Sequence, residues 1–265
     1  MKTQVLEKHR ERTFYTMIIY NCDCRDYLRK CDPGSYDTIF ADPPDNLGLK
    51  YGTYKDAISE NDYYFGLISP VILESLRVCK VFWISYYWRH DLEIKSLVRD
   101  ILRNYRPSWQ AKTFIWRYTF GQHNSRDCGS GFRYLLRISS SSWKPCVDKI
   151  RVQSVRQAMG DKRADSRGRV PDDVWEFDAD GIWTEFPRVV GNSHERMSFH
   201  PTQHPEGLIE RILRLSGSKR VLDVFSGTGT TLRVAKRLGL DGDGCEIDTD
   251  YCRRIAAELG IGMDK

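Results

Sequence analysis

A glycine turn flanked by carboxylates in the C-terminal third could hold a nucleoside-like ligand. The apolar run that starts at Val221 reaches Asp223 and then turns through Gly227 and Gly229 before Thr231. Glycines in such a turn let the backbone approach a ligand without a Cβ in the way. Like charge would repel a phosphate beside Asp223, so the turn favours a cationic or amino-bearing nucleoside. S-adenosylmethionine has both properties.

A second acidic residue follows this turn at a spacing typical of ribose recognition. Glu246 stands near the end of the next apolar segment, 242–247, with Asp248 just beyond it. An acidic side chain about twenty residues after the turn accepts hydrogen bonds from ribose hydroxyls. The alternative is a plain strand-to-helix connection with a solvated Glu246. The order of strand, turn, helix, strand and acid favours the cofactor site.

A third carboxylate leads into a stiff proline loop. Asp42 follows the apolar run 37–41 and precedes Pro43 and Pro44. A residue before proline is pushed to an extended conformation, and each proline fixes its own φ and lacks an N–H. The Asp42 carboxylate and the Pro43 carbonyl are therefore two acceptors at fixed spacing, which suit an exocyclic NH2 group. The alternative is an ordinary Pro-Pro turn that ends a strand.

These motifs together resemble the permuted β group of DNA amino-methyltransferases, which modify adenine N6 or cytosine N4. The segment 21–28 resembles the adenine-contacting loop of that family, and 200–205 resembles its segment that packs on the methionine part of the cofactor. The resemblance covers most of residues 16–142 and 185–260. The residues that it and the motifs imply for binding S-adenosylmethionine are Asp23, Cys24, His200, Thr202, Asp223, Phe225, Gly227, Gly229, Thr230, Thr231, Glu246 and Asp248.

The resemblance implies site-specific transfer of a methyl group to the exocyclic amine of a base in double-stranded DNA. The base is expected to be flipped out, because its amine cannot reach the donor inside the stack. Asp42 as first motif residue favours adenine N6, with cytosine N4 as the alternative. A catalytically silent DNA-binding relative and an RNA substrate also stay open. A nicotinamide-dependent dehydrogenase fits poorly, since it normally carries its glycine turn near the start of its fold.

One position departs from the pattern of the resembled family. That family usually has Tyr, Phe or Trp after the two prolines, where the ring stacks on the flipped base, whereas this chain has Asp45. We place Asp45 in the catalytic set with Asp42, Pro43 and Pro44. The candidate replacements for the stacking ring are Phe120, His123 and Tyr51.

Alternating apolar elements predict the scaffold that must position these residues. Strands are expected over 16–20, 37–41, 81–87, 113–119, 133–140, 220–225 and 242–247. Apolar residues keep helical spacing over 68–76 and 208–213, and the second helix should stop at Gly217. This alternation indicates a doubly wound α/β fold with a mostly parallel sheet, and the resemblance implies that the fold is the Rossmann-like one of S-adenosylmethionine-dependent methyltransferases.

Residues 143–190 break the alternation and are interpreted as an irregular recognition insertion between a catalytic half, 1–142, and a cofactor-binding half, 191–265. From Lys149 to Arg169, seven basic residues accompany two acidic ones, an excess equal to the net charge of the whole chain, +5. Such a loop could neutralise DNA phosphates, although a solvated surface loop is the alternative. The residues expected to contact nucleic acid are Lys149, Arg151, Arg156, Lys162, Arg163, Arg167 and Arg169.

Length and composition fit one catalytic domain with an insertion. The 265 residues, with 40% hydrophobic content, can bury one sizeable core. The eight cysteines lack paired Cys-x-x-Cys spacing, which argues against a zinc cluster or a disulfide framework. No apolar run approaches membrane-spanning length, so we expect a cytoplasmic enzyme that needs no metal. The sequence leaves open whether it acts as a monomer or a homodimer.

Overall fold

One nine-stranded sheet organises the described part of the chain. The computed structural model describes residues 16–118, 125–176 and 185–264. The strands lie in the order β6-β4-β5-β3-β2-β7-β8-β1-β9. Their bounds are β1 Met17–Asn21, β2 Tyr36–Ala41, β3 Cys79–Tyr86, β4 Trp109–Arg117, β5 Phe132–Ser140, β6 Val174–Trp175, β7 Arg220–Asp223, β8 Asp241–Glu246 and β9 Gly262–Asp264.

The seven predicted strands are all present, and the doubly wound, mostly parallel α/β fold is confirmed. Only the pairs β3–β5 and β4–β5 are antiparallel among the described strands. The two short edge strands β6 and β9 were not predicted, because segments of two and three residues carry no detectable alternation.

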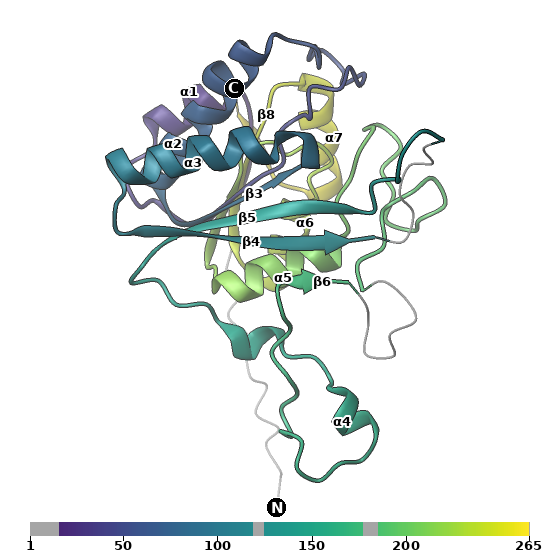
Figure 1. Ribbon diagram of the computed structural model, residues 1–265. Helices are drawn as coiled ribbons and strands as arrows, with labels where there is room; N and C mark the ends of the chain where they lie inside the picture. The colour runs from purple at the N-terminus through teal and green to yellow at the C-terminus, as the bar shows by residue number, and fades with distance from the viewer. Residues whose placement is uncertain (1–15, 119–124, 177–184, 265) are drawn as a thin grey trace, which may run out of the picture.

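Helices cover both faces of the sheet (Figure 1). On one face α1, α2 and α3 pack over Ile39, Ala41 and Phe82, whereas α5, α6 and α7 pack over Phe40 on the other. Successive side chains of a strand point to opposite faces, so β2 contributes to both cores. The helices and helical turns are α1 Cys24–Lys30, η1 Asp62–Ile68, α2 Ser69–Val78, η2 Trp88–His90, α3 Asp91–Tyr105, η3 Val147–Ile150, α4 Val155–Ala158, α5 Glu206–Ser216, α6 Thr230–Leu238 and α7 Thr249–Leu259.

Both predicted helical stripes are buried, and α5 ends where predicted. Ile72 and Leu76 lie on the buried face of α2, and Ile209 and Ile212 lie on the buried face of α5. Each of these side chains is at most 1% exposed. Gly217 stops α5 at φ +66°, a left-handed conformation that glycine adopts without a Cβ clash. Burying side chains of this size contributes roughly 1.5 to 3 kcal/mol each.

The strand register brings the ends of distant strands to one edge of the sheet. Phe40 pairs with Asp223, Asp223 with Gly244, and Asn21 with Glu246. The strand order reverses between the neighbours β2 and β7: β3 follows β2 on one side, and β8 follows β7 on the other. Such a switch point opens a crevice at the carboxyl ends of the strands. Because β5 is antiparallel to β3, its first residues also lie at this edge.

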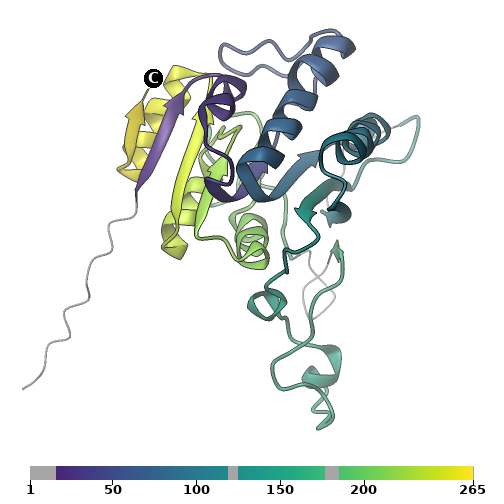
Figure 2. The same ribbon diagram turned by 90° about the vertical axis from the view of Figure 1, so that its left-hand side faces the viewer.

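The insertion is irregular, as expected, and part of it projects from the body. The segment 147–170, with η3 and α4, hangs below the sheet in both views (Figures 1 and 2). A backbone bridge between Val152 and Arg169 closes its base. Gly168, at φ +89°, lies there against the Val152 carbonyl, where a Cβ would come within 2.4 Å of its oxygen. Among the described residues, no helix is both long enough and apolar enough to cross a membrane.

Candidate active site

One cavity at the carboxyl edge of the sheet is lined by almost all the residues predicted for catalysis and cofactor binding. Asp42, Pro43, Pro44 and Asp45 line it, and so do eleven of the twelve residues predicted to hold the cofactor. The exception is Gly229, whose missing Cβ leaves room for Ile255 of α7, 3.0 Å from the position that a Cβ would take. Gly229 therefore serves the packing of α6 against α7.

The glycine turn is built for close approach. Gly227 has φ +49°, and a Cβ there would lie 3.1 Å from the His200 ring. The Gly227 N–H donates to the Glu246 carboxylate at 2.9 Å, which ties the turn after β7 to the end of β8. The ring of His200 lies between those of Tyr51 and Tyr251, at centroid distances of 5.3 and 5.2 Å. Burial lowers the pKa of His200, which favours its neutral form.

The pKa values of two carboxylates in this cavity are raised. Burial raises the pKa of Glu246 to about 7, although the N–H groups of Asp248 and Gly227 oppose the shift. Burial likewise raises the pKa of Asp223 to about 6, against hydrogen bonds from Thr231 and from the Phe225 N–H. A cationic or hydroxyl-rich ligand would favour the ionised form of both carboxylates.

Two predicted cofactor residues, Asp23 and Asp248, also cap helices. The Asp23 carboxylate caps α1 and pairs with the Arg25 guanidinium at 2.5 Å. The Asp248 carboxylate caps α7 and also accepts the Thr53 N–H at 3.0 Å. Cys24 is buried beside them, and burial raises the pKa of its thiol, so it remains a neutral thiol.

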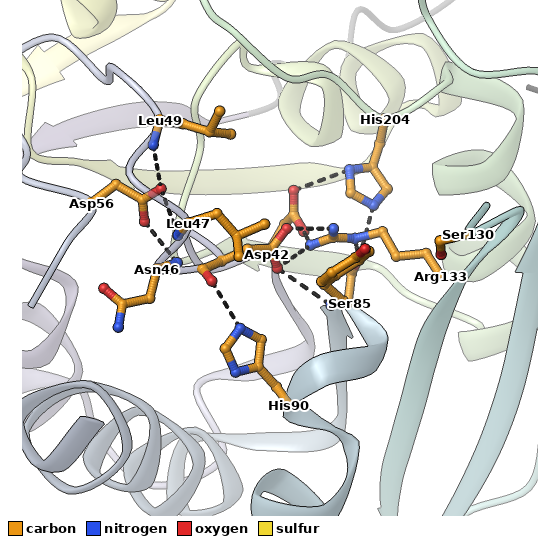
Figure 3. Close-up of polar contacts among 12 residues, drawn as sticks. Asp42, Asn46, Leu47, Leu49, Asp56, Ser85, His90, Ser130, Arg133 and His204 are labelled. Carbon is orange, nitrogen blue, oxygen red and sulfur yellow. Dashed lines mark hydrogen bonds and ion pairs between the residues drawn. The ribbon is translucent and has the colours of Figure 1, made fainter. Parts of the chain in front are cut away.

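At the end of β2, Asp42 belongs to a closed polar network (Figure 3). Arg133, near the start of β5, donates from Nη2 to Asp42 Oδ1 at 2.9 Å and from Nη1 to Asp45 Oδ2 at 2.6 Å. His204 Nδ1 lies 3.1 Å from Asp42 Oδ2, and its Nε2 lies 3.0 Å from Ser85 Oγ. Ser85 Oγ also accepts from Arg133 Nε at 2.8 Å.

This network keeps Asp42 ionised. Burial alone would raise the pKa of Asp42, but His204 and Arg133 outweigh it and hold the pKa well below its usual range. Burial would lower the pKa of Arg133, yet Asp45 and Asp42 raise it instead. The site therefore presents a charged acceptor at the end of β2 throughout the physiological pH range.

The loop after the prolines is held firmly and places Tyr51 over the cavity. The Asp56 carboxylate accepts the backbone N–H groups of Asn46, Leu47 and Leu49 at 2.7 to 3.2 Å. Asn46, at φ +52°, completes this turn through hydrogen bonds to Ile58. Tyr51 is thus a cavity-lining ring, whereas the other two stacking candidates, Phe120 and His123, lie outside the described residues.

Sequence reasoning missed three members of the network: Ser85, Arg133 and His204. Ser85 and Arg133 lie inside predicted strands, where a polar residue reads as surface. The second histidine of His200-Pro201-Thr202-Gln203-His204 was a usable signal. Its ring packs between Phe40 and Trp116, which fixes its orientation toward Asp42.

Comparison with known proteins identifies the family. A family model described as DNA methylase, for the N6 and N4 enzymes, matches residues 36–258. The type II methyltransferase M.HpaI of Haemophilus parainfluenzae is 30% identical over 240 residues, covering 88% of this chain and 70% of the relative. The chain belongs to the N6/N4 DNA methylase family. Its methyl donor is S-adenosylmethionine.

Further relatives share the fold or the sequence of this methylase. The DNA adenine methyltransferase YhdJ of Escherichia coli is 29% identical over 254 residues, 88% of this chain and 79% of that protein. The PvuII cytosine-N4-specific methyltransferase structure has TM-score 0.63 at 14% identity, covering 91% of this chain and 85% of that one. The Thermus thermophilus TTHA0409 complex with S-adenosyl-L-methionine has TM-score 0.60 at 18% identity, covering 95% and 97%. The described chain thus has the fold of both.

The raised pKa of Glu246 predicts how the methylase binds its cofactor as pH changes. If ribose hydroxyls donate to this carboxylate, affinity is full above its pKa and is lost as pH falls through about 7. With only the ionised fraction competent, affinity should be roughly tenfold higher at pH 8 than at pH 6. Calorimetry across this range measures it. Glu246→Gln should remove the step near pH 7 and keep any contribution of Asp223; an unchanged profile would contradict the assignment.

Four of the seven cations predicted to contact DNA are paired with nearby carboxylates. Arg151 and Arg167 contact Asp148 and Asp165, and Arg163 contacts Asp161. Arg169 lies 3.8 Å from Asp172. The predicted excess of charge is therefore smaller than it seemed, since Asp148 and Asp172 stand just outside the segment counted. Of these seven cations, Lys149, Arg156 and Lys162 have no carboxylate of the described residues within salt-bridge distance, and all three are exposed.

These differences predict which insertion cations matter most for DNA binding. Replacing Lys149, Arg156 and Lys162 together by Ala should weaken DNA binding and flatten its salt dependence by about 0.9 in log–log slope for each phosphate that is no longer neutralised. The matched triple variant of Arg163, Arg167 and Arg169 should change the slope less, because exposed ion pairs already occupy those charges. Fluorescence anisotropy against salt measures both slopes. An unchanged slope in both variants would make the insertion an ordinary surface loop.

Proposed function

We propose that this methylase is a site-specific DNA adenine-N6 methyltransferase that acts on a flipped base of double-stranded DNA. One observation carries the proposal: the Asp42 carboxylate shares a single cavity with the glycine turn and Glu246. A donor bound at the turn and an amine bound at Asp42 would meet inside that cavity. Aspartate at the first motif position favours adenine. Cytosine N4 is the second candidate, supported by the fold shared with the PvuII enzyme.

The cavity residues fit S-adenosylmethionine. Glu246 would accept the ribose hydroxyls, and Cys24 with Asp23 would flank the adenine. Gly227 keeps the turn open to the methionine portion, since a Cβ there would press on His200. Asp223 adds a buried carboxylate that a cationic ligand would keep ionised. When bound, the cofactor supplies an electrophilic methyl group.

Asp42 and the Pro43 carbonyl would hold the two hydrogens of the target amine and turn its lone pair toward the methyl carbon. The amine nitrogen would form the new N–C bond while the methyl group leaves the sulfonium sulfur of the donor, with no covalent bond to the enzyme. The charge of Asp42 would stabilise the positive charge that develops on the amine, and the methylated amine would then release one proton to solvent. Positioning and this fixed charge supply most of the rate.

Transfer of a tritiated methyl group tests the proposal. The enzyme is incubated with labelled cofactor and double-stranded DNA, single-stranded DNA or RNA. We expect the label in double-stranded DNA. Label in RNA alone would assign a different substrate, and DNA binding without transfer would indicate a silent relative. A DNA substrate implies a cytoplasmic enzyme, and sedimentation equilibrium would show whether it works as a homodimer.

A further inference from the structure

Arg133 lies between the two carboxylates of the Asp-Pro-Pro-Asp segment. Its guanidinium makes a two-pronged contact with Asp45, from Nη1 to Oδ2 at 2.6 Å and from Nη2 to Oδ1 at 3.0 Å. The same Nη2 reaches Asp42 Oδ1 at 2.9 Å. The side chains of Arg133 and Asp45 are only 14% and 12% exposed, so water screens these charges weakly. Asp42 and Asp45 therefore compete for one buried cation.

The charge of this trio matters for the proposed chemistry. Asp42 has to stabilise an amine that becomes positive, and a cation bound to Asp42 alone would cancel its charge. With Asp45 present, two carboxylates share one guanidinium, so the three side chains of Asp42, Asp45 and Arg133 keep one net negative charge. His204 Nδ1 contacts the other Asp42 oxygen at 3.1 Å in either case. The paired geometry also gives Arg133 a complete partner in Asp45 when Asp42 turns to the substrate. Neither effect is available to a residue without charge at position 45.

We propose that Asp45 is a positioning residue: it is the counter-ion that holds Arg133 and so leaves the Asp42 carboxylate negative and accessible to the target amine. This inference deepens the proposed function and rests on it. It explains why position 45 carries a carboxylate where the resembled family carries an aromatic ring. The base must then stack elsewhere in the cavity, where Tyr51 is available.

The backbone around Asp45 does not depend on its carboxylate alone. His90 Nε2 lies 2.8 Å from the Asp45 carbonyl oxygen, and the Asp56 carboxylate binds the backbone of the three residues Asn46, Leu47 and Leu49. Among the residues that the structure describes, the one backbone N–H that donates to this carboxylate is that of Tyr87, at 3.3 Å. A neutral isostere at position 45 should therefore fold, and its effect on transfer can be measured.

A double-mutant cycle tests the inference. Single-turnover methyl transfer to double-stranded DNA is measured for the parent, Asp45→Asn, Arg133→Gln and the double variant, with cofactor affinity followed by calorimetry. Asp45→Asn should slow transfer at least about tenfold while cofactor affinity stays within about threefold, because Arg133 then neutralises Asp42. The double variant should recover most of that loss, since the competing cation is gone. A merely structural role would instead make the double variant as poor as, or poorer than, Asp45→Asn.

Two more variants at position 45 and one distant control complete the test. Asp45→Glu, which keeps the charge, should stay within a few-fold of the parent, whereas Asp45→Tyr should lose activity although it restores the usual ring. Glu74→Gln removes another partly buried ion pair, with Arg77 on α2, and should leave transfer unchanged. Full activity of Asp45→Asn, or no recovery in the double variant, overturns the inference while the parent still methylates DNA. A parent that methylates no DNA overturns the proposed function, and the inference falls with it.

Discussion

Asp42→Ala should abolish methyl transfer while leaving cofactor affinity within about twofold of the parent. The proposed partner of this carboxylate is the target amine, and removing one preorganised group at a developing charge typically costs on the order of 10²- to 10³-fold in rate. Single-turnover transfer and calorimetry on the same preparation separate the two effects. Arg133 keeps Asp45 as a partner in this variant, so the network does not leave a bare buried cation.

Asp26→Ala is the matched control for this experiment. Asp26 is an exposed carboxylate on α1 that pairs with Arg29, outside the cavity. The Asp26→Ala protein should transfer methyl groups at the parental rate. Turnover of Asp42→Ala within a few-fold of the parent would remove Asp42 from the catalytic role.

Glu246→Ala should weaken binding of S-adenosylmethionine about ten- to a hundredfold. Loss of a buried, charge-assisted acceptor typically costs about 1.5 to 3 kcal/mol, and each 1.4 kcal/mol is a factor of ten. The substitution also releases the Gly227 N–H, which Glu246 accepts at 2.9 Å, so the turn loses a restraint. Calorimetry measures the affinity.

Glu258→Ala serves as the control for Glu246→Ala. Glu258 of α7 pairs with Arg233 of α6 and does not line the cavity. The Glu258→Ala protein should therefore bind the cofactor with the affinity of the parent. A folded Glu246→Ala protein with parental affinity would show that the ribose lies elsewhere.

The positions of the three carboxylates could be predicted because the carboxyl ends of parallel strands lie at the same edge of the sheet. Asp42, Asp223 and Glu246 each stand at or just after the end of a strand, and parallel pairing places such ends at one edge of the sheet. Their meeting in one cavity is therefore foreseeable from the sequence. The same logic predicted the glycine turn, where Gly227 adopts positive φ and binds Glu246.

The partners of Asp42 could not be predicted in the same way. Arg133 reaches the site because β5 runs antiparallel to β3, and apolar periodicity does not report strand direction. His204 is positioned by packing between Phe40 and Trp116, which are far from it in sequence. The departure at Asp45 was visible in the sequence, yet its meaning depends on Arg133. The sequence shows that the usual ring is absent at position 45, and the structure shows that the carboxylate there pairs with Arg133.

The net charge of the insertion also depends on contacts that the sequence did not predict. Counting only 149–169 overstated its excess, because Asp148 and Asp172 lie next to that segment and contact its arginines. Ion pairing depends on how the loop closes, here through the bridge between Val152 and Arg169. Lys149, Arg156 and Lys162 are thus the stronger candidates for phosphate contacts.

Mass spectrometry of nucleosides shows which base the enzyme methylates and whether Asp42 is needed. Unmethylated DNA is incubated with the enzyme and S-adenosylmethionine, then digested completely, with the Asp42→Ala protein in parallel. We predict N6-methyladenine with the parent enzyme and no methylated nucleoside with Asp42→Ala. N4-methylcytosine without N6-methyladenine would contradict the adenine assignment, and equal yields from the two proteins would contradict the role of Asp42.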